Sequence, residues 1–415
     1  MKIGFIGGAG EMASLYARIL HEKEHEILVS DTDKERLRQE YAGLEVRICE
    51  SNKEAARLSD LLVYSTPIPE TPEIIKESAP FLRENAAVGG FTSVKVYEVD
   101  ALLKYSPVDA EIITFHPMHG PSLKPENQKF IIIPVRTGNG SKLEEIEGIA
   151  KSTGIGVSYI NSAKEHDKIM ADTQILTHFA FLSMGNAWRM LGFLPEGNKT
   201  YQNEVDRIKA LFTKRILSQN PEVYAGIAIF NPEAKSHVRQ YINSLDSIME
   251  SVLKEDRKNL FAKWQDIVNF LGKDELKTSD KVLNKLFSQD YNIESQTNSY
   301  LSQFALGDSF MNLGIKPQDN IAFQSPPYKI LSLLVHKILN GNSEHYINNA
   351  IHNLETKRHD YYFCKSATVL AEIVESGNYQ GFIDFFKKSA EFFGEDELEK
   401  ARIETDELIE RLARI

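Results

Sequence analysis

The sequence predicts an α/β domain followed by an all-α region that contains two tandem copies of one helical domain. Short apolar strands alternate with helical patterns up to about residue 160. Beyond residue 163 the strand pattern stops, and helical periodicity continues to the C-terminus. The later part of this helical region repeats the earlier part. We therefore expect domains at 1–160, 161–280 and 281–415.

The bulk composition excludes several classes of partner. The chain has 415 residues, of which 42% are hydrophobic, and this is enough for buried cores in two or three domains. Its formal net charge is -11. Nucleic acids and anionic membranes select basic surfaces, so we expect no nucleic-acid partner and no membrane partner. A locally basic pocket for a small anion stays possible.

Cysteine usage and the N-terminus indicate a cytoplasmic protein. Cys49 and Cys364 are far apart and have no metal-ligand spacing, so we expect neither a disulfide framework nor a metal site. Met1 leads directly into a strand, which leaves no room for a signal peptide. No apolar run is long enough to cross a bilayer.

The first strand, residues 2–6, leads into a glycine-rich turn and then a helix. Gly8, Gly10 and Ala13 match the G-x-G-x-x-G/A frame of a Rossmann-type dinucleotide site. The first glycine permits the tight turn, the second lets the backbone approach the pyrophosphate, and the small third residue lets helix and strand pack closely. The helix N-terminus offers N–H groups and a positive dipole end to the phosphates.

Asp31 follows the second strand, residues 26–30, about twenty residues beyond the glycines. A carboxylate at this place bonds the ribose hydroxyls and repels a 2′-phosphate, which favours NAD over NADP. Lys34 and Arg36 lie nearby and keep NADP possible. The alternative is that Asp31 caps a helix that starts near Asp33.

Further strands are expected at 61–65, 86–90, 111–115, 129–135 and 156–160. In open parallel sheets, ligands lie beyond the carboxyl ends of the strands, where this chain places Thr66, Ser93 and His116. We expect the cofactor to contact eight residues of the glycine turn and the strand ends: Gly8, Gly10, Glu11, Met12, Asp31, Ser65, Thr66 and Pro67.

The helical region begins with Glu165-His166-Asp167, which we expect to open one long helix through about Leu191. Gln174 and His178 lie four residues apart and share a face of that helix. Arg215 is a third polar candidate, further along the chain.

A shift of 122 residues aligns 174–276 with 296–398 without a gap, and about a quarter of the aligned positions are identical. The matches include Gln174/Gln296, Gly185/Gly307, Leu191-Gly192/Leu313-Gly314, Pro195/Pro317, Tyr224/Tyr346, Asn231/Asn353, His237/His359 and Asp274-Glu275-Leu276/Asp396-Glu397-Leu398. Such a register indicates tandem duplication. The packing residues are kept, whereas His178 pairs with Tyr300, Arg215 with Lys337 and Asn186 with Asp308. We therefore expect the second copy to be structural.

Taken together, these motifs resemble the prephenate dehydrogenase family of tyrosine biosynthesis over about residues 1–275. The segments that carry the resemblance are Gly7-Gly8-Ala-Gly10-Glu-Met12, His116-Pro-Met-His-Gly-Pro121, Glu165-His166-Asp167, Gln174-Ile-Leu-Thr-His178-Phe, Lys-Arg215-Ile and Asn220-Pro-Glu-Val-Tyr224. Archaeal members look most similar, and the second repeat resembles the family's helical domain without its substrate residues. No regulatory ACT domain is evident.

The resemblance implies a nicotinamide-dependent oxidoreductase that converts prephenate to 4-hydroxyphenylpyruvate and carbon dioxide, with NAD or NADP as cofactor. Arogenate is an alternative substrate, and a non-catalytic dinucleotide-binding sensor or scaffold is an alternative function. Other dehydrogenases of Rossmann-plus-helical build, such as β-hydroxyacid and pyrroline carboxylate reductase types, do not need the His116 and Glu165-His166-Asp167 motifs.

By resemblance, His116 is the catalytic histidine, and the near-neutral pKa of histidine suits a base at the substrate's ring hydroxyl. The alternative is a histidine that holds its own loop. Ser93 matches a serine that orients this histidine, and its alternative is a helix N-cap before Val94-Lys95.

Arg215 matches the family's carboxylate clamp, since a guanidinium gives bidentate recognition; the alternative is a surface ion pair. His178 matches a substrate-contacting histidine, with a core histidine as the alternative. For His166 we favour packing and capping at a helix start. Gln174 is retained as Gln296, which favours a structural role, and His119 departs from the family pattern.

Members of this family dimerise through intertwined helical domains. We hypothesise that the second copy fills the partner's place, with 281–415 covering the usual dimer surface. The chain is then a monomer with a pseudo-dimeric helical core, or a weak homo-oligomer.

Overall fold

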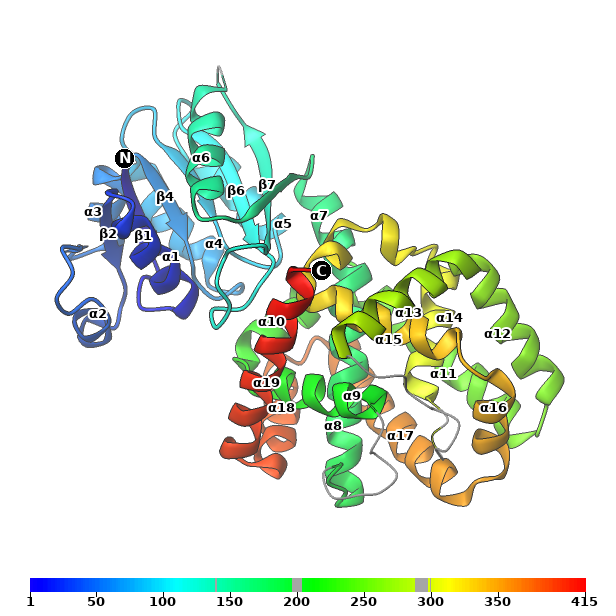
Figure 1. Cartoon of the computed structure of the whole chain (residues 1–415). Coiled ribbons are helices and arrows are strands. Elements are labelled where there is room, and N and C mark those ends of the chain that lie inside the picture. The colour runs from blue at the N-terminus through cyan, green and yellow to red at the C-terminus, as the bar shows by residue number, and fades with distance from the viewer. Residues whose placement is uncertain (139, 196–203, 288–297, 299) are drawn as a thin grey trace. The chain divides into compact units, whose positions relative to one another are not determined.

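The computed structural model describes residues 1–138, 140–195, 204–287, 298 and 300–415. These residues form two compact units, Met1–Met170 and Ala171–Ile415. The first is an α/β unit and the second is entirely helical (Figure 1). The predicted fold class is confirmed.

The first unit is built on an eight-stranded sheet, counted over the described residues, with the order β3-β2-β1-β4-β5-β6-β7-β8. All neighbouring strands are parallel except β6 and β7, which run antiparallel. The strands are β1 (Lys2–Ile6), β2 (Glu26–Ser30), β3 (Arg47–Ile48), β4 (Leu61–Tyr64), β5 (Ala87–Gly90), β6 (Glu111–Pro117), β7 (Lys129–Arg136) and β8 (Gly156–Tyr159). Strand β3 is too short for a sequence pattern to indicate, and β6 continues past the expected end through His116.

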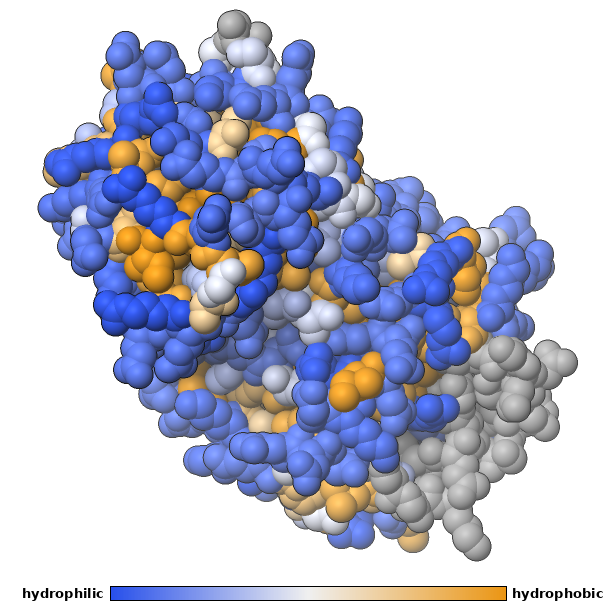
Figure 2. Space-filling model, turned by 60° about the vertical axis from the view of Figure 1, so that its left-hand side comes forward, coloured by the Kyte–Doolittle hydropathy of each residue, from blue (hydrophilic) through white to orange (hydrophobic). Residues whose placement is uncertain are grey.

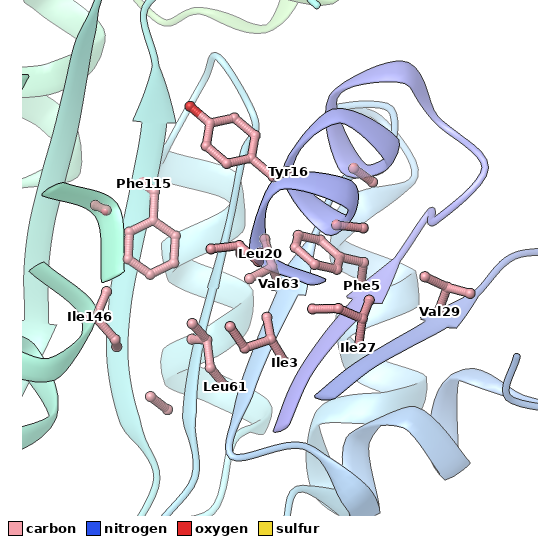
Figure 3. Close-up of a cluster of buried hydrophobic side chains, with 14 of the residues drawn as sticks. Ile3, Phe5, Tyr16, Leu20, Ile27, Val29, Leu61, Val63, Phe115 and Ile146 are labelled. Carbon is pink, nitrogen blue, oxygen red and sulfur yellow. The ribbon is translucent and has the colours of Figure 1, made fainter. Parts of the chain in front are cut away.

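Helices cover both faces of this sheet: α1 (Glu11–Glu22), α2 (Lys34–Glu40), α3 (Asn52–Leu58), α4 (Thr71–Ser78), α5 (Val96–Tyr105), α6 (Ser141–Ser152) and α7 (Ala163–Met170). Alternate residues of each strand face opposite cores. On one face Phe5, Val63 and Phe115 pack with Tyr16 of α1 and Ile146 of α6 (Figure 3). The opposite core contains residues of α3, α4 and α5.

This alternation also positions the functional strand end. Phe115 lies in the core beside α1 and α6, so Thr114 and His116 point to the other face, where α5 lies. Thr114 accordingly bonds to Lys95, which precedes α5.

Helix α7 groups with the sheet, although the sequence placed residues from 161 onward in the helical domain. The reason is polar, because His166 and Asp167 of α7 bond to residues of the sheet unit. The expected single helix through Leu191 is also interrupted, since a π-helical turn at Ala171–Ile175 separates α7 from α8. Such turns are rare and often occur at functional sites.

The second unit contains α8 (Leu176–Leu191), α9 (Glu204–Leu217), α10 (Pro221–Phe230), α11 (Ala234–Leu253), α12 (Arg257–Leu271), α13 (Lys273–Phe287), α14 (Leu301–Leu313), α15 (Pro326–Leu339), α16 (Ser343–His352), α17 (Leu354–Ser376), α18 (Tyr379–Phe393) and α19 (Glu395–Ala413). A shift of 122 residues places α9, α10 and α12 on the bounds of α15, α16 and α18. Gly192 and Gly314 both end their helices in the left-handed conformation, which glycine adopts without strain.

The two sets of helices pack crosswise. Helix α8 contacts α17, and its counterpart α14 contacts α11, the counterpart of α17. The pairs α9 with α19 and α15 with α13 follow the same rule, as do α10 with α18 and α16 with α12. Each copy therefore buries its apolar faces against the other, which is the contact pattern of a two-fold dimer within one chain.

Hydrophilic residues dominate the molecular face shown in Figure 2, and the apolar patches there are separate from one another. In the described part of the chain, no helix combines the length and the apolar character that crossing a bilayer requires.

Candidate active site

The glycine turn after β1 is shaped by close approach. Gly7 has φ of +80°, and a Cβ on it would lie 2.3 Å from the carbonyl oxygen of Ser65. A Cβ on Gly8 would lie 2.8 Å from Val29. Gly7, rather than Gly8, is thus the residue that permits the tight turn. Gly10 precedes α1 without a side-chain cap on that helix, as expected for a helix N-terminus that faces a phosphate.

Asp31 lies at the carboxyl end of β2 and is joined to this turn. Its Oδ2 accepts a hydrogen bond from the Ala9 amide at 3.1 Å, and its Oδ1 accepts one from the Asp33 amide at 3.1 Å. The N-cap of α2 is Asp33 itself, which accepts from the Arg36 amide. The capping alternative for Asp31 is therefore wrong. Its carboxylate lies beside the glycine turn, where a ribose binds in Rossmann sites.

Glu11 is exposed and Met12 half-buried in the first turn of α1. Ser65 and Thr66 are half-buried after β4, and Pro67 is exposed. Because β1, β2 and β4 are parallel neighbours, their carboxyl ends bring the expected cofactor residues to one edge of the sheet.

Three buried side chains form a hydrogen-bonded series at the end of β6. His116 Nδ1 lies 2.8 Å from His166 Nε2, and His166 Nδ1 lies 2.8 Å from Asp167 Oδ1. Asp167 in turn accepts the backbone amides of Lys95 at 2.7 Å and Val96 at 3.0 Å, at the start of α5. The first turn of α5, which has no side-chain cap of its own, is thus bound by Asp167.

This series defines where the protons lie. A carboxylate only accepts, so His166 Nδ1–H donates to Asp167 and His166 Nε2 becomes an acceptor. His116 Nδ1–H must then donate to His166. The remaining nitrogen of neutral His116, Nε2, carries the lone pair. The arrangement prepares His116 as a base.

Burial keeps both histidines neutral. Burial first, and then His166, holds the pKa of His116 well below its usual value, while burial and then Lys95 do the same to the pKa of His166. Burial raises the pKa of Asp167 to about 6 against the hydrogen bonds from the two amides. Lys95 is fully buried and paired with Glu98 at 3.0 Å.

Ser93 is half-buried in the loop after β5, the strand beside β6. Helix α5 begins at Val96 with Lys95 as its N-cap residue, so the N-cap alternative for Ser93 is wrong.

His119 has partners of its own, because its Nδ1 donates to the Gly120 carbonyl and its Nε2 accepts from Tyr16. It connects β6 with α1.

In the helical unit, Arg215 is 7% exposed, so the alternative of a surface ion pair is wrong. Its Nε donates to Asp406 Oδ1 at 3.0 Å. Its Nη2 is buried and has no hydrogen-bond partner among the described residues. A buried N–H without a partner is costly, which makes this atom a candidate ligand contact.

His178 lies between two tyrosine rings, with its ring centre 4.5 Å from that of Tyr224 and 5.9 Å from that of Tyr328. Burial, and then the charge of Arg215, lowers the pKa of His178 to about 3. Gln174 Nε2 donates to Tyr328 Oη at 2.9 Å, and Gln174 Oε1 has no partner in the described part of the chain. His178, Arg215 and Gln174 therefore belong to one cluster.

Sequence reasoning missed four members of these clusters. Asp167 stood in a motif that we had noted, but its bonds to Lys95 and Val96 depend on tertiary packing. Tyr328 and Asp406 belong to the second copy, and Tyr328 aligns with the chemically unrelated Asp206. Lys95 was noted only as a residue that follows Ser93.

Two family descriptions match the chain. Residues 16–159 match "Prephenate dehydrogenase, nucleotide-binding domain". Residues 175–414, more than half of the chain, match a Tyr-1-like family of the 6-phosphogluconate dehydrogenase C-terminal domain.

Two curated fungal proteins are similar to it. The Saccharomyces cerevisiae protein named prephenate dehydrogenase [NADP(+)] is 30% identical over 99% of this chain and 93% of its own length. A Schizosaccharomyces pombe protein named probable prephenate dehydrogenase [NADP(+)] is 32% identical over 79% of this chain and 78% of its own length.

An archaeal protein from Methanocaldococcus jannaschii, named probable arogenate/prephenate dehydrogenase, is 28% identical over 71% of this chain and 69% of its own length. This identity is below that of the two fungal proteins. The structure of A. aeolicus prephenate dehydrogenase with hydroxyphenyl propionate and NAD+ covers 63% of this chain and 94% of that chain, with 20% identity and a TM-score of 0.50. It supports the fold.

Proposed function

We propose a catalytic arrangement for this chain, which belongs to the prephenate dehydrogenase family. The chain is a nicotinamide-dependent oxidoreductase that oxidatively decarboxylates prephenate. The observation that carries the arrangement is the series from His116 through His166 to Asp167, which leaves His116 Nε2 as an acceptor.

His116 Nε2 accepts the hydrogen bond of the ring hydroxyl while hydride leaves the carbon that bears it. Loss of carbon dioxide from the opposite ring carbon provides the electron pair that completes the aromatic ring. A nicotinamide cofactor held by the glycine turn would supply the hydride acceptor. Asp167 holds His166, and His166 holds His116, so both are positioning residues. Ser93 is proposed to hydrogen-bond the same hydroxyl.

On the substrate side, Arg215 binds a carboxylate through Nη2 and His178 contacts the substrate beside it. Two facts support this: Nη2 is buried without a partner in the described residues, and His178 is neutral at physiological pH. A neutral imidazole can donate a hydrogen bond without placing a second buried charge next to the guanidinium.

For the cofactor, we propose that Gly8, Gly10, Glu11 and Met12 line the pyrophosphate and that Asp31 approaches the ribose. The close approaches at the glycine turn leave room for no side chain, which fits a backbone that contacts phosphates. Asp31 favours NAD, whereas both fungal relatives carry NADP(+) in their names.

The test is a matrix of prephenate and arogenate, each with NAD and with NADP, followed by absorbance of the reduced cofactor. Turnover with prephenate is expected. Turnover with arogenate but not with prephenate would identify arogenate as the substrate. No turnover in any combination would overturn the enzymatic function in favour of a sensor or scaffold.

His116→Asn tests the base. We expect kcat to fall by about a hundredfold to ten-thousandfold, because general base catalysis contributes that much, with cofactor binding unchanged. Asp167→Asn should lower kcat less, because Asp167 acts on His116 only through His166; it should also lower the melting temperature, since one amide at the start of α5 loses its acceptor. Near-normal turnover of His116→Asn would remove this residue from the mechanism.

We also propose that the crosswise packing of the two copies replaces a dimer interface, so that the chain works as a monomer or a weak homo-oligomer. The equivalent contacts of α8 with α17 and of α14 with α11, each between the two copies, support this. Light scattering is expected to give the mass of one chain at low concentration. A tight dimer joined through the first helical copy would contradict the proposal.

A further inference from the structure

The second helical copy extends two side chains toward the substrate cluster of the first. Tyr328 lies in the first turn of α15, and its ring lies against His178. Asp406 lies in the last helix, α19, and binds the Nε of Arg215. The other members of the cluster, Gln174, His178 and Arg215, belong to the first copy.

This cluster contains donors that a ligand with oxygen acceptors can satisfy, and one acceptor, Gln174 Oε1, without a partner among the described residues. Arg215 Nη2 is buried and has no partner among the described residues. Tyr328 Oη accepts the bond from Gln174, so its own proton is not used in that bond. Two donors, one of them charged, suit a carboxylate.

The charge of Arg215 acts on three neighbours in this cluster. Its positive charge lowers the pKa of His178 and opposes the burial that raises the pKa of Tyr224 and of Tyr328. The side chain of Tyr328 is half-buried.

At the counterpart positions in the other half of the unit, the side chains contact other residues of the protein. Tyr300, which replaces His178, is fully buried, with the Lys209 ammonium 4.8 Å from its ring centre. Asp206, the counterpart of Tyr328, accepts a hydrogen bond from Asn298 at 3.0 Å. Lys337, the counterpart of Arg215, pairs with Asp280. The matched polar positions therefore differ between the two halves: they bond to protein residues in one half and keep a donor that no described residue pairs with in the other.

We propose that the second copy completes the substrate site of the first, with Tyr328 donating a hydrogen bond to the substrate carboxylate that Arg215 binds. The second copy is thus more than a scaffold: it provides a residue of substrate specificity. This inference rests on the proposed function.

The test compares Tyr328→Phe with Tyr346→Phe, which removes a hydroxyl from a buried tyrosine of the same copy outside the cluster. We expect Tyr328→Phe to raise the KM for prephenate about ten- to hundredfold, the loss typical of a hydrogen bond to a charged group, with kcat within about twofold. Tyr346→Phe should leave KM unchanged, and the melting temperatures of both variants identify any folding defect.

An unchanged KM in Tyr328→Phe would overturn the inference, and so would an equal rise in both variants, because that would indicate packing alone. Wild-type turnover separates the two claims. An active wild type with an indifferent Tyr328→Phe contradicts only this inference. An inactive wild type that also fails to bind 4-hydroxyphenylpropionate in calorimetry contradicts the proposed function, and the inference with it.

Discussion

The two helical copies share a fold but differ in the contacts of their buried polar residues. In the first copy, Arg215 keeps a buried Nη2 without a partner in the described residues. In the second, Lys337 at the same place pairs with Asp280, and Tyr300 replaces His178 with an aromatic side chain. Buried polar groups are normally paired, and at these matched positions it is Arg215 that leaves a buried donor without a partner among the described residues, which supports our proposal that the first copy binds the ligand.

The comparison also separates packing from chemistry. Gly185 and Gly307 lie at equivalent close helix contacts, and Gly192 and Gly314 both end helices in the left-handed conformation. The residues that build the fold were kept in both copies, while those proposed to contact substrate were kept in one. Changes made at matched positions of the two copies can therefore break or sharpen the contrast.

The largest effect is expected for Arg215→Gln, matched by Lys337→Gln. The first removes the charge that binds the substrate carboxylate and should reduce kcat/KM about a hundredfold, mainly through KM. The second removes a charge that pairs with Asp280 and should leave kcat and KM unchanged. Equal losses in steady-state assays would contradict the asymmetry of the copies.

Exchanging the residues of the other pair should have a smaller effect. His178→Tyr introduces the second copy's residue into the substrate cluster and should reduce kcat/KM about tenfold or more, because the larger ring places its donor elsewhere and the imidazole donor is lost. Tyr300→His should keep activity but lower the free energy of unfolding by about 1–3 kcal/mol, since it leaves a space beside Lys209. Denaturant titration and kinetics on both variants decide; an activity loss in Tyr300→His would contradict the structural role.

Acidification should destabilise both copies. Burial lowers the pKa of His178 to about 3 and that of His336, in α15, to about 4. The unfolded chain protonates these histidines below about pH 6.5, whereas the folded chain does not. Stability present above pH 6.5 is therefore lost as the pH falls, by up to about 1.4 kcal/mol per pH unit and histidine. Asp167 acts in the opposite sense. A melting temperature that is flat from pH 7 to pH 5 would exclude this linkage.

The smallest effect is expected from the glycine pair. A Cβ at Gly185 would lie 2.8 Å from Leu217, and one at Gly307 would lie 3.0 Å from Leu339. Gly185→Ala and Gly307→Ala should each cost about 1 kcal/mol, because overpacking outweighs the gain in helix propensity. Similar shifts in melting temperature are expected. A shift in only one variant would show that the two copies do not pack alike.

The sequence predicted those features that depend on local pattern. The α/β domain, its strand ends and the glycine turn follow from periodicity and short motifs, and these were right to within a few residues. His116, His178 and Arg215 were found because each stood in a motif. Their roles stay predictions.

The features that were missed depend on contacts distant in sequence. The bond from Asp167 to the start of α5 spans residues 95 to 167, and no pattern in either segment indicates it. We favoured packing for His166, although its ring in fact links His116 to Asp167. Tyr328 could not be found by alignment, because the duplication pairs it with Asp206 and its proposed role arises only when the copies pack crosswise.

The number of substrate-analogue sites per chain tests the asymmetry of the copies most directly. Calorimetry with 4-hydroxyphenylpropionate in saturating NADP or NAD would measure it, with Arg215→Gln and Lys337→Gln as matched controls. We predict one site per chain, which Arg215→Gln weakens and Lys337→Gln leaves intact. Two sites per chain, or a site weakened by Lys337→Gln, would contradict the account.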